Sequence, residues 1–444
     1  MKTLNNILFT LFCLLISSNL IAQNRQAEKL HQRISTSSYD EFSPCVSPDG
    51  LTLYFTRTGS PEFVKTLIED GEDLSEQLSK NAYNQELSRV YSQLAGKPIG
   101  NPSKSVFNQD IWMAQSAVDE FDILLHPEAP LNNALPNSIS AIMPSTNEVI
   151  LVNQFVEQGG MKKGFSKSKR NADGSWDFPK PISINNFHNS GTDVNLSISH
   201  DGKVMVMALE RQDAFGRSDL YICFKQNNGS WTAPKNLGRG INTPFREATP
   251  HLSADMKQLY FSSDRGNKNG RSNIYVQKRL GDSWEKWSAP QKFRSPINSA
   301  ANDSHPHFCQ ATGRLYFASD RAGSWDIYRI PIAQAQPNGL VVAGQVFNDA
   351  DMKAIDALVV SGDGMGNKIV SSTRNGHFKL LLPWNKKIKI TARKKGFKEA
   401  YTVIATGPAM KTDFVKEIKL MLEPIEVKSK QPKVATLAST QTQI

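Results

Sequence analysis

Short stretches in which apolar and polar residues alternate run along most of this chain, from about residue 33 to residue 332, and turn-forming residues bound each stretch. "LYFSSDRGNKNGRSNIYVQKR", residues 259–279, returns as "LYFASDRAGSWDIYRI", residues 315–330. Alternation with a period of two predicts half-buried β-strands, and no helical periodicity competes with it in these stretches. The pattern therefore predicts hairpins, written more than once.

Further copies of the same unit can be aligned with these two. They read "EFSPCVSPDGLTLYFTRTG" continued by "NQDIWMAQS", a degenerate "SISAIMPSTNEVILVNQF", and "VNLSISHDGKVMVMALERQDAFGRSDLYICFK". The turns at Gly202, Met256 and Gly313 are spaced about 55 residues apart. Four short strands in each repeated unit indicate a β-propeller, because no single unit can bury its apolar face alone. We expect five blades, or six if the degenerate region hides another copy.

The last unit lacks the linker of the form "W…P…I-N" that closes the others. A related segment lies at the front of the chain, where "RISTSSYDEFSP" aligns with "GINTPFREATP". We therefore expect residues 33–40 to supply the missing outer strand and to close the ring, which would cover an exposed sheet edge.

Arginines recur at equivalent places after the second strand of the units, and a carboxylate or amide recurs at the start of the third strand. A guanidinium can form a forked ion pair across a hairpin and fix its register. Residues that recur from blade to blade are expected to be structural rather than catalytic. The set comprises Arg57, Arg211, Arg265 and Arg321 with Asp110, Asp219, Asn273 and Asp326.

Residues 60–107 form an insertion in the first blade, and its apolar residues have helix-like spacing. Such an amphipathic helix either packs onto the propeller or contacts a partner. Its candidate partner contacts are Leu74, Leu78, Leu87 and Tyr91.

From residue 340 to residue 424 the alternating pattern continues without the propeller motifs and predicts an antiparallel β-sandwich. "GDGMGN" within it is expected to be a hairpin turn, and residues 425–444 are expected to be a disordered tail. The formal charge of the whole chain is +10, and residues 340–444 contribute 17 Lys and Arg against 9 Asp and Glu. This basic surface is either a solvated face of a small β-domain or a contact for an anionic envelope polymer, lipid head groups or an acidic protein surface. Its candidate contacts are Lys386, Lys387, Arg393, Lys394 and Lys395.

Residues 1–22 have the layout of a secretory signal, with Lys2, an apolar core and Ala22 before the expected cleavage point. We therefore expect an exported protein of the periplasm, the outer-membrane surface or the extracellular space, without a transmembrane span. Nucleic acid is then not an expected partner. Removal of the signal leaves three cysteines, which excludes a disulfide framework.

The motifs "SPDG", "LYF", "SDR" and "DIY" resemble the TolB-like (WD40-like) propeller repeats of bacterial envelope proteins over residues 33–332. "VAGQV", "STRNGHFKLLLP" and "ARKKGFKEA" resemble a carboxypeptidase-regulatory, transthyretin-like domain. The order of these two domains is similar to that of Bacteroidota envelope proteins that end in an OmpA-like peptidoglycan-binding domain, some of which serve type IX secretion and gliding. No OmpA-like module follows in this sequence, so the resemblance does not imply direct attachment to peptidoglycan.

Candidate chemistry is sparse. No Gly-x-Ser-x-Gly nucleophile motif is present. Cys45, His251 and His307 occupy equivalent positions after a repeated proline, and His305 is adjacent; together they could converge in the channel and ligate a metal, although the same positions are suited to packing. We expect no cofactor, no metal and no enzymatic activity. The predicted function is a non-catalytic, exported scaffold that binds protein partners in an envelope assembly. The alternative is a secreted carbohydrate-active enzyme or glycan-binding protein that uses the channel.

Overall fold

The computed structural model describes residues 26–143, 146, 148–191, 194–267, 269–337, 339–362, 368–407 and 415–425. The predicted signal (1–22), most of the "GDGMGN" turn (363–367) and the predicted tail from residue 426 onward lie outside these residues.

In the described ranges, no helix has the length and apolar character needed to cross a membrane.

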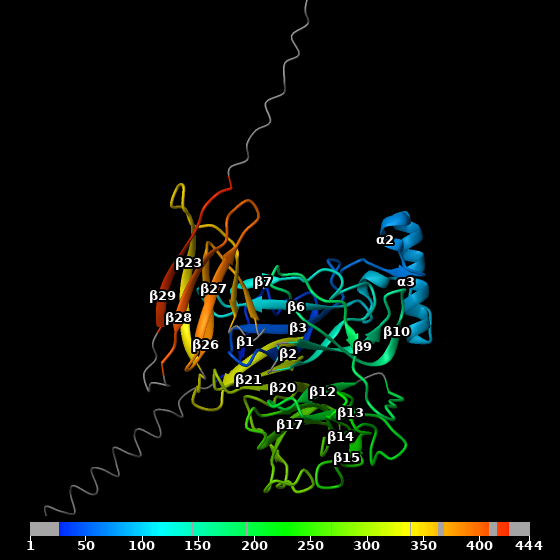
Figure 1. The fold of residues 1–444 in the computed structure, drawn as a ribbon. Helices are drawn as coiled ribbons and strands as arrows, with labels where there is room; N and C mark the ends of the chain where they lie inside the picture. The colour runs from blue at the N-terminus through cyan, green and yellow to red at the C-terminus, as the bar shows by residue number, and fades with distance from the viewer. Residues whose placement is uncertain are drawn as a thin grey trace, which may run out of the picture.

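Five four-stranded antiparallel sheets make up the described part of residues 26–337, in the arrangement of propeller blades (Figure 1). The innermost strands are β2 (Asp40–Val46), β8 (Ser138–Met143), β12 (Asn195–Ile198), β16 (Glu247–Leu252) and β20 (Asp303–Cys309). The second strands are β3 (Thr52–Thr58), β9 (Glu148–Phe155), β13 (Val204–Leu209), β17 (Gln258–Ser263) and β21 (Arg314–Ser319). The third strands are β6 (Gln109–Gln115), β10 (Met161–Ser168), β14 (Asp219–Phe224), β18 (Asn273–Lys278) and β22 (Asp326–Pro331). The outer strands are short: β7 (Ile123–Leu125), β11 (Lys180–Pro181), β15 (Lys235–Asn236), β19 (Gln291–Lys292) and, in the fifth blade, β1 (Glu28–Lys29).

The blades form a closed ring. Each innermost strand lies next to the innermost strand of the following blade, and β20 of the fifth blade lies next to β2 of the first. Second and third strands supply the apolar faces that pack between blades, with Phe55, Phe261 and Phe317 fully buried. The predicted all-β propeller is confirmed, and the described residues contain five blades.

The N-terminal segment closes the ring, but through residues other than the predicted ones. The register of β1 pairs Glu28 with Arg329 and Lys29 with Tyr328. The prediction that residues 33–40 supply this strand is wrong. "RIS" at residues 33–35 is instead equivalent to the segment that follows an outer strand. There the Ser35 hydroxyl accepts a hydrogen bond from the Ile327 amide at 3.0 Å.

The insertion between β3 and β6 folds onto the propeller. It contains β4 (Ile68–Glu69), β5 (Glu72–Asp73), α2 (Leu74–Gln77), α3 (Lys80–Ala95) and the 3-10 helix η1 (Pro102–Lys104). The Ser79 side chain caps the N-terminus of α3, and Gly96 ends the helix with φ 64°. Leu87 and Tyr91 are fully buried, and the Tyr91 hydroxyl donates to the Ala134 carbonyl at 2.6 Å.

The predicted role of these residues as partner contacts is therefore corrected. Leu87 and Tyr91 are not accessible to a partner, because they pack with residues of the first two blades. Leu74 and Leu78 are partly buried against the same cluster. The apolar face of the insertion is thus used within the molecule.

Residues 339–425 form a β-sandwich. One sheet has the order β26 (His377–Pro383), β23 (Gly339–Asn348), β29 (Val415–Leu422), and the other has the order β25 (Lys368–Ser372), β24 (Leu358–Gly362), β27 (Lys387–Arg393), β28 (Ala400–Ala405). Phe378 and Ile390 are fully buried between the sheets. β29 pairs with β23 in parallel, so the domain is not the purely antiparallel sandwich that alternation predicted.

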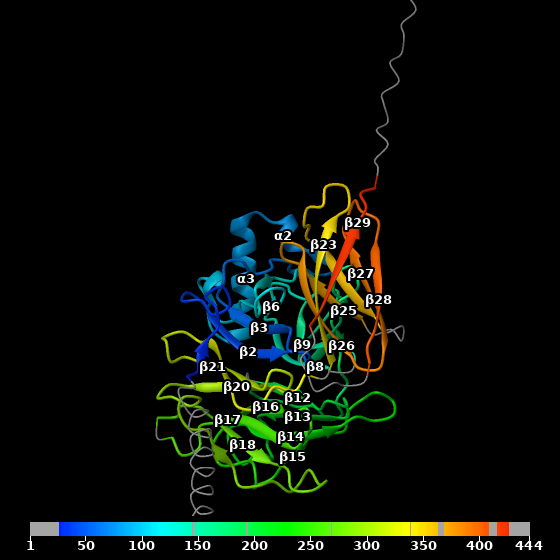
Figure 2. The same cartoon turned by 90° about the vertical axis from the view of Figure 1, so that its left-hand side faces the viewer.

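The sandwich is docked on the propeller beside the first two blades (Figures 1 and 2). The Gln115 side chain donates to the Val370 carbonyl at 3.1 Å and accepts from the Ser372 amide at 2.9 Å. Arg170 of the second blade also donates to the Val370 carbonyl, at 3.2 Å. These contacts cover the β25 edge of the sandwich and hold the two domains together.

Candidate functional site

Three of the four repeated arginines pair with a carboxylate on the innermost strand of their own blade, not with the predicted group on the third strand. Nε of Arg57 lies 2.8 Å from Oε1 of Glu41. Equivalent pairs join Arg265 to Glu247 at 3.0 Å and Arg321 to Asp303 at 2.6 Å, and all three carboxylates are fully buried. The guanidinium also lies over an aromatic ring of the third strand, for example 4.3 Å above Trp112 for Arg57.

Asp110 and Asp219, two of the partners predicted for these arginines, form hydrogen bonds with other groups. Asp110 accepts from the Val64 amide at 2.7 Å and lies 2.8 Å from the ring nitrogen of His126. Asp219 accepts from the Phe215 amide and from Asn236 of the outer strand, each at 2.8 Å. An aspartate at this place stabilises the preceding loop by accepting its amides, as it does in turns, and is then not available to the arginine.

The remaining members of the predicted set, Asp326, Asn273 and Arg211, form other contacts. Asp326 pairs with Lys29 of β1 at 2.8 Å, which adds a charged contact to the closure of the ring. The side-chain Nδ2 of Asn273 donates to the Arg271 carbonyl at 3.4 Å. Arg211 pairs with Asp213 at 3.1 Å. The predicted pairing across the hairpin is therefore wrong for the whole set. That these recurring residues have a structural role in the blades stays a proposal.

The sequence contained a signal for the true partners. Glu41, Glu247 and Asp303 each stand three residues before the repeated proline, in "EFSP", "EATP" and "DSHP". That recurrence was as regular as the aspartate pattern on the third strand.

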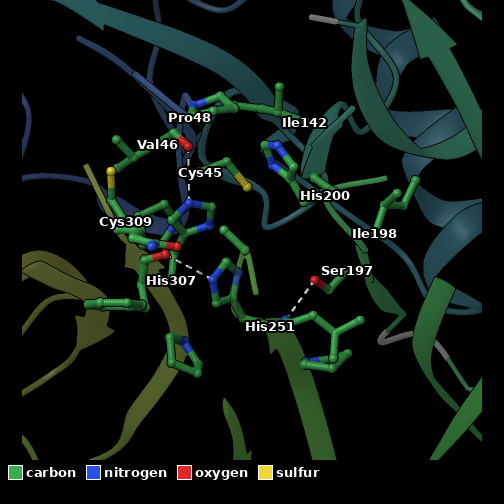
Figure 3. A pocket seen from close by; sticks show the side chains of 18 of the residues that line it. Cys45, Val46, Pro48, Ile142, Ser197, Ile198, His200, His251, His307 and Cys309 are labelled. Atoms are coloured by element: carbon green, nitrogen blue, oxygen red, sulfur yellow. Dashed lines mark hydrogen bonds between the residues drawn. The ribbon is translucent and has the colours of Figure 1, made fainter. Parts of the chain in front are cut away.

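A cavity of about 400 Å³ lies on the axis of the propeller, where the five innermost strands meet (Figure 3). Its wall mixes apolar side chains with hydroxyl, thiol and imidazole groups. The lining includes Cys45, Ile142, Ser197, Ile198, His200, His251, His307 and Cys309.

All four predicted channel residues, Cys45, His251, His305 and His307, line this cavity. The rings of His251 and His307 have centroids 4.2 Å apart. Nε2 of His251 lies 3.1 Å from the Phe308 carbonyl, and Nε2 of His307 lies 3.0 Å from the Val46 carbonyl. A carbonyl only accepts, so each Nε2 carries the proton and each Nδ1 keeps a lone pair.

Side chains of the innermost strands bond to the backbone of the following blade all the way around the ring. The two histidines form the links from the fourth blade to the fifth and from the fifth to the first. The other links are Cys45 Sγ to the Ser140 carbonyl, the Leu196 amide to Ser140 Oγ, and the Leu252 amide to Ser197 Oγ. The polar groups of the channel therefore join neighbouring blades.

Burial favours the neutral forms of His251, His305, His307 and Cys45. It lowers the pKa of His251 from its usual 6.5 to about 4 and that of His305 to about 3. The pKa of His307 is also well below its usual value, through burial and the neighbouring His251. Burial raises the pKa of the Cys45 thiol to about 12, so it is not a thiolate at neutral pH.

The innermost strands are strained beside the cavity. Ser43, Thr249 and His305 precede the repeated proline and have φ of 52°, 46° and 51°. Residues with a side chain rarely adopt this region, and a β-branched threonine does so least readily. The Thr249 hydroxyl stabilises the arrangement by accepting from the His305 amide at 3.1 Å.

The described residues contain no group of three or more His, Cys, Asp or Glu side chains arranged to hold a metal ion. Thiolate is the form of cysteine that binds metals, and Cys45 is a protonated donor instead.

The predicted basic contacts lie on the sandwich. Lys386, Lys387, Lys394 and Lys395 are exposed, whereas Arg393 pairs with Glu399 at 2.8 Å. The Lys394 ammonium donates to the Asp356 carbonyl at 2.7 Å.

No family model and no curated protein sequence matches this chain. Solved structures do match it. One is TolB from Acinetobacter baumannii, with 12% identity and a TM-score of 0.31, over 82% of this chain and 76% of that one. The α-L-arabinofuranosidase from Lactobacillus brevis has 11% identity and a TM-score of 0.39, over 69% and 98%. That from Podospora anserina has 10% identity and a TM-score of 0.38, over 70% and 98%.

TolB, whose propeller repeats this sequence resembles, is thus among the structures that match. The prediction that this protein is not an enzyme is contradicted, because enzymes are among the solved structures that the chain matches. At these identities the similarity concerns the fold, and no reaction is assigned from it.

Proposed function

We propose that this protein is an exported, outer-membrane-associated component of a cell-envelope assembly and that it binds a protein partner there. The observation that carries the proposal is the fixed docking of a basic sandwich on a closed propeller. Gln115 and Arg170 hold the β25 edge, while lysines such as Lys387 and Lys389 on β27 stay exposed. A rigid body with one basic face supports partner binding by charge complementarity.

The sequence supports the location. Residues 1–22 have the layout of a secretory signal, and the order of propeller and sandwich resembles that of Bacteroidota envelope proteins. On that resemblance we propose an assembly related to type IX secretion or gliding, with a propeller over residues 23–335 and a regulatory-type sandwich over residues 340–424.

Cell fractionation combined with site-specific cross-linking tests this proposal. A photo-cross-linking residue in place of Tyr401, beside the exposed lysines, should yield one defined adduct in the envelope fraction. The same residue in place of Val106, which is 65% exposed in the insertion, is the matched control. The mature chain should begin near residue 23. A cytoplasmic location, or identical adducts from both positions, would contradict the proposal.

The cavity favours a second candidate function, the binding or processing of a saccharide in the channel. Ligand sites are concave, largely apolar and carry a few polar groups, as this cavity does. Among the described lining residues the acidic one is Asp255, which accepts from the Lys257 amide at 3.0 Å. Calorimetric titration with oligosaccharides, together with an assay for released sugars, tests this candidate. An Ile142→Trp variant that fills the cavity should abolish either signal.

A further inference from the structure

The outer edge of β28 differs from the other sheet edges of the sandwich. β28 reads "AYTVIA" and contains no charged residue, no proline and no glycine. In the described residues it pairs with β27 on one side and with no strand on the other. Native proteins usually protect such an edge, because its unpaired amides and carbonyls can bind another chain.

The other edges are protected. Gln115 and Arg170 of the propeller bond to the backbone of β25. β26 carries Lys379, which donates to the Val118 carbonyl of the propeller, and it ends at Pro383. β29 carries alternating charges in "VKEIKLML". β28 lies next to β29 of the facing sheet, but among the described edge strands of the sandwich it alone carries no charge and has no propeller group bonded to it.

The ladder between β27 and β28 identifies the backbone groups that face outward. The Thr406 amide donates to the Lys386 carbonyl at 2.9 Å, immediately beyond the strand. Hydrogen-bonded pairs alternate in an antiparallel ladder, so Thr402 and Ile404 face β27. The amides and carbonyls of Tyr401 and Val403 therefore point to the open edge.

The same two residues present exposed apolar side chains. Tyr401 is 64% exposed and Val403 is 56% exposed. The ammonium of Lys389 lies 4.1 Å from the centre of the Tyr401 ring, and Lys387 is exposed on the same strand and face. No ion-pair partner for either lysine is present in the described part of the chain. The edge thus combines a free hydrogen-bonding ladder, two apolar side chains and uncompensated positive charge.

We propose that an extended acidic segment of a partner protein binds the β28 edge as an added antiparallel strand. A polypeptide is the occupant because only an amide backbone matches the alternating donors and acceptors at Tyr401 and Val403. Its acidity follows from Lys387 and Lys389, which would meet its side chains on the outer face. The positive charge of the domain also opposes pairing with a second copy of this chain. The proposal refines the partner-binding role given above.

Fluorescence anisotropy with the full mature chain tests this inference. The probe is a blocked, labelled peptide in which glutamate alternates with valine, and the control peptide has lysine in place of glutamate. The acidic peptide should bind with salt-dependent affinity, and the lysine peptide should not. Reversal of both charges (Lys387→Glu with Lys389→Glu) should weaken binding at least about tenfold.

Val403→Pro separates strand addition from simple charge attraction. Proline removes one outward amide and is tolerated on a sheet edge, while Val403→Thr keeps the amide and the shape. The proline variant should bind about tenfold more weakly, as expected for one lost ladder bond, and the threonine variant within about twofold of the original. Unchanged thermal unfolding of both variants serves as the folding control.

Three outcomes would overturn the inference. One is equal binding of a probe peptide N-methylated at alternate residues. Another is full competition by an anionic polysaccharide together with no effect of Val403→Pro. The last is a concentration-dependent dimer in sedimentation that Val403→Pro abolishes, which would make a second copy the occupant. Because the peptide assay is done in vitro, its failure is distinguishable from failure of the proposed envelope location.

Discussion

The propeller and the sandwich use charged residues in opposite ways. In the propeller, Arg57, Arg265 and Arg321 are mostly buried, and each is matched by a fully buried carboxylate. In the sandwich, Lys386, Lys387 and Lys389 stand exposed, and residues 340–444 carry most of the surplus positive charge. A repeated and paired charge fixes the geometry of a blade, whereas an exposed and unpaired charge is available to a partner.

The largest expected effect follows from breaking a buried pair. Arg321→Met would leave Asp303 without its partner and would release the carbonyls of Pro296 and Ile297, to which the guanidinium donates at 2.8 and 2.6 Å. Loss of one partner of a buried ion pair costs about 3–5 kcal/mol in the free energy of unfolding. Urea denaturation measures it.

Lys387→Met is the matched control from the sandwich and should change the free energy of unfolding by less than about 0.5 kcal/mol. Equal effects of the two substitutions would remove the contrast between the domains.

Acid should destabilise the propeller through its channel. The unfolded chain binds protons at its histidines below pH 6.5, while His251 in the fold stays neutral down to about pH 4. The unfolded state therefore binds more protons in this window, and stability falls as the pH decreases from 6.5 to 4, by at most about 1.4 kcal/mol per pH unit for each such histidine.

His251→Gln keeps a donor for the Phe308 carbonyl but does not titrate, so it should flatten the pH dependence of the unfolding midpoint. His188→Gln changes an exposed histidine and should leave the slope as it was. A slope that is the same in all three proteins would contradict the neutral histidine pair.

A smaller effect is expected from the asparagines that follow the outer strands. Oδ1 of Asn298 accepts from the Ile274 amide at 2.7 Å, and its Nδ2 donates to the Ile274 carbonyl at 2.9 Å. Asn298→Ala would leave both buried groups unsatisfied and should cost about 1–3 kcal/mol. Thermal unfolding measures this loss, and Asn302→Ala, at a partly buried neighbour, is the control. If Asn298→Ala lowers the stability no more than Asn302→Ala does, this role of Asn298 is contradicted.

The smallest effect concerns the docking of the two domains. Gln115→Ala removes two hydrogen bonds to β25 and should lower the free energy of unfolding by about 1 kcal/mol. Limited proteolysis should then cleave more rapidly between Ile332 and Pro337. Gln336→Ala, which alters the linker itself, provides the comparison, and an unchanged cleavage rate for Gln115→Ala would show that other contacts suffice for docking.

Much of the fold follows from local patterns. The period of two, the turns and the repeat length predict the blades, because each unit has the same strands and the same faces to bury. The pairing of Arg57 was not predictable in this way, because Glu41 and Asp110 both lie opposite it across the ladder. Which of them pairs depends on the Val64 amide of the insertion, which donates to Asp110.

The channel and the docked edge illustrate two further limits. The repeats indicated that Cys45, His251 and His307 could converge, but their protonation depends on the carbonyls of the following blade and on burial. The contact of Gln115 with β25 joins residues more than 250 positions apart, and no repeat or composition marks it. Non-local contacts of this kind depend on how the domains dock, which local patterns do not specify.

Native-state hydrogen exchange of the full chain is the most direct test of the central claim, that the N-terminal segment closes a single ring. The amide of Ile327, which bonds to Ser35 across the closure, should exchange as slowly as that of Ile274, which bonds to Asn298 within one blade. Exchange of Ile327 at the rate of a fraying terminus, with Ile274 still protected, would contradict the closed ring.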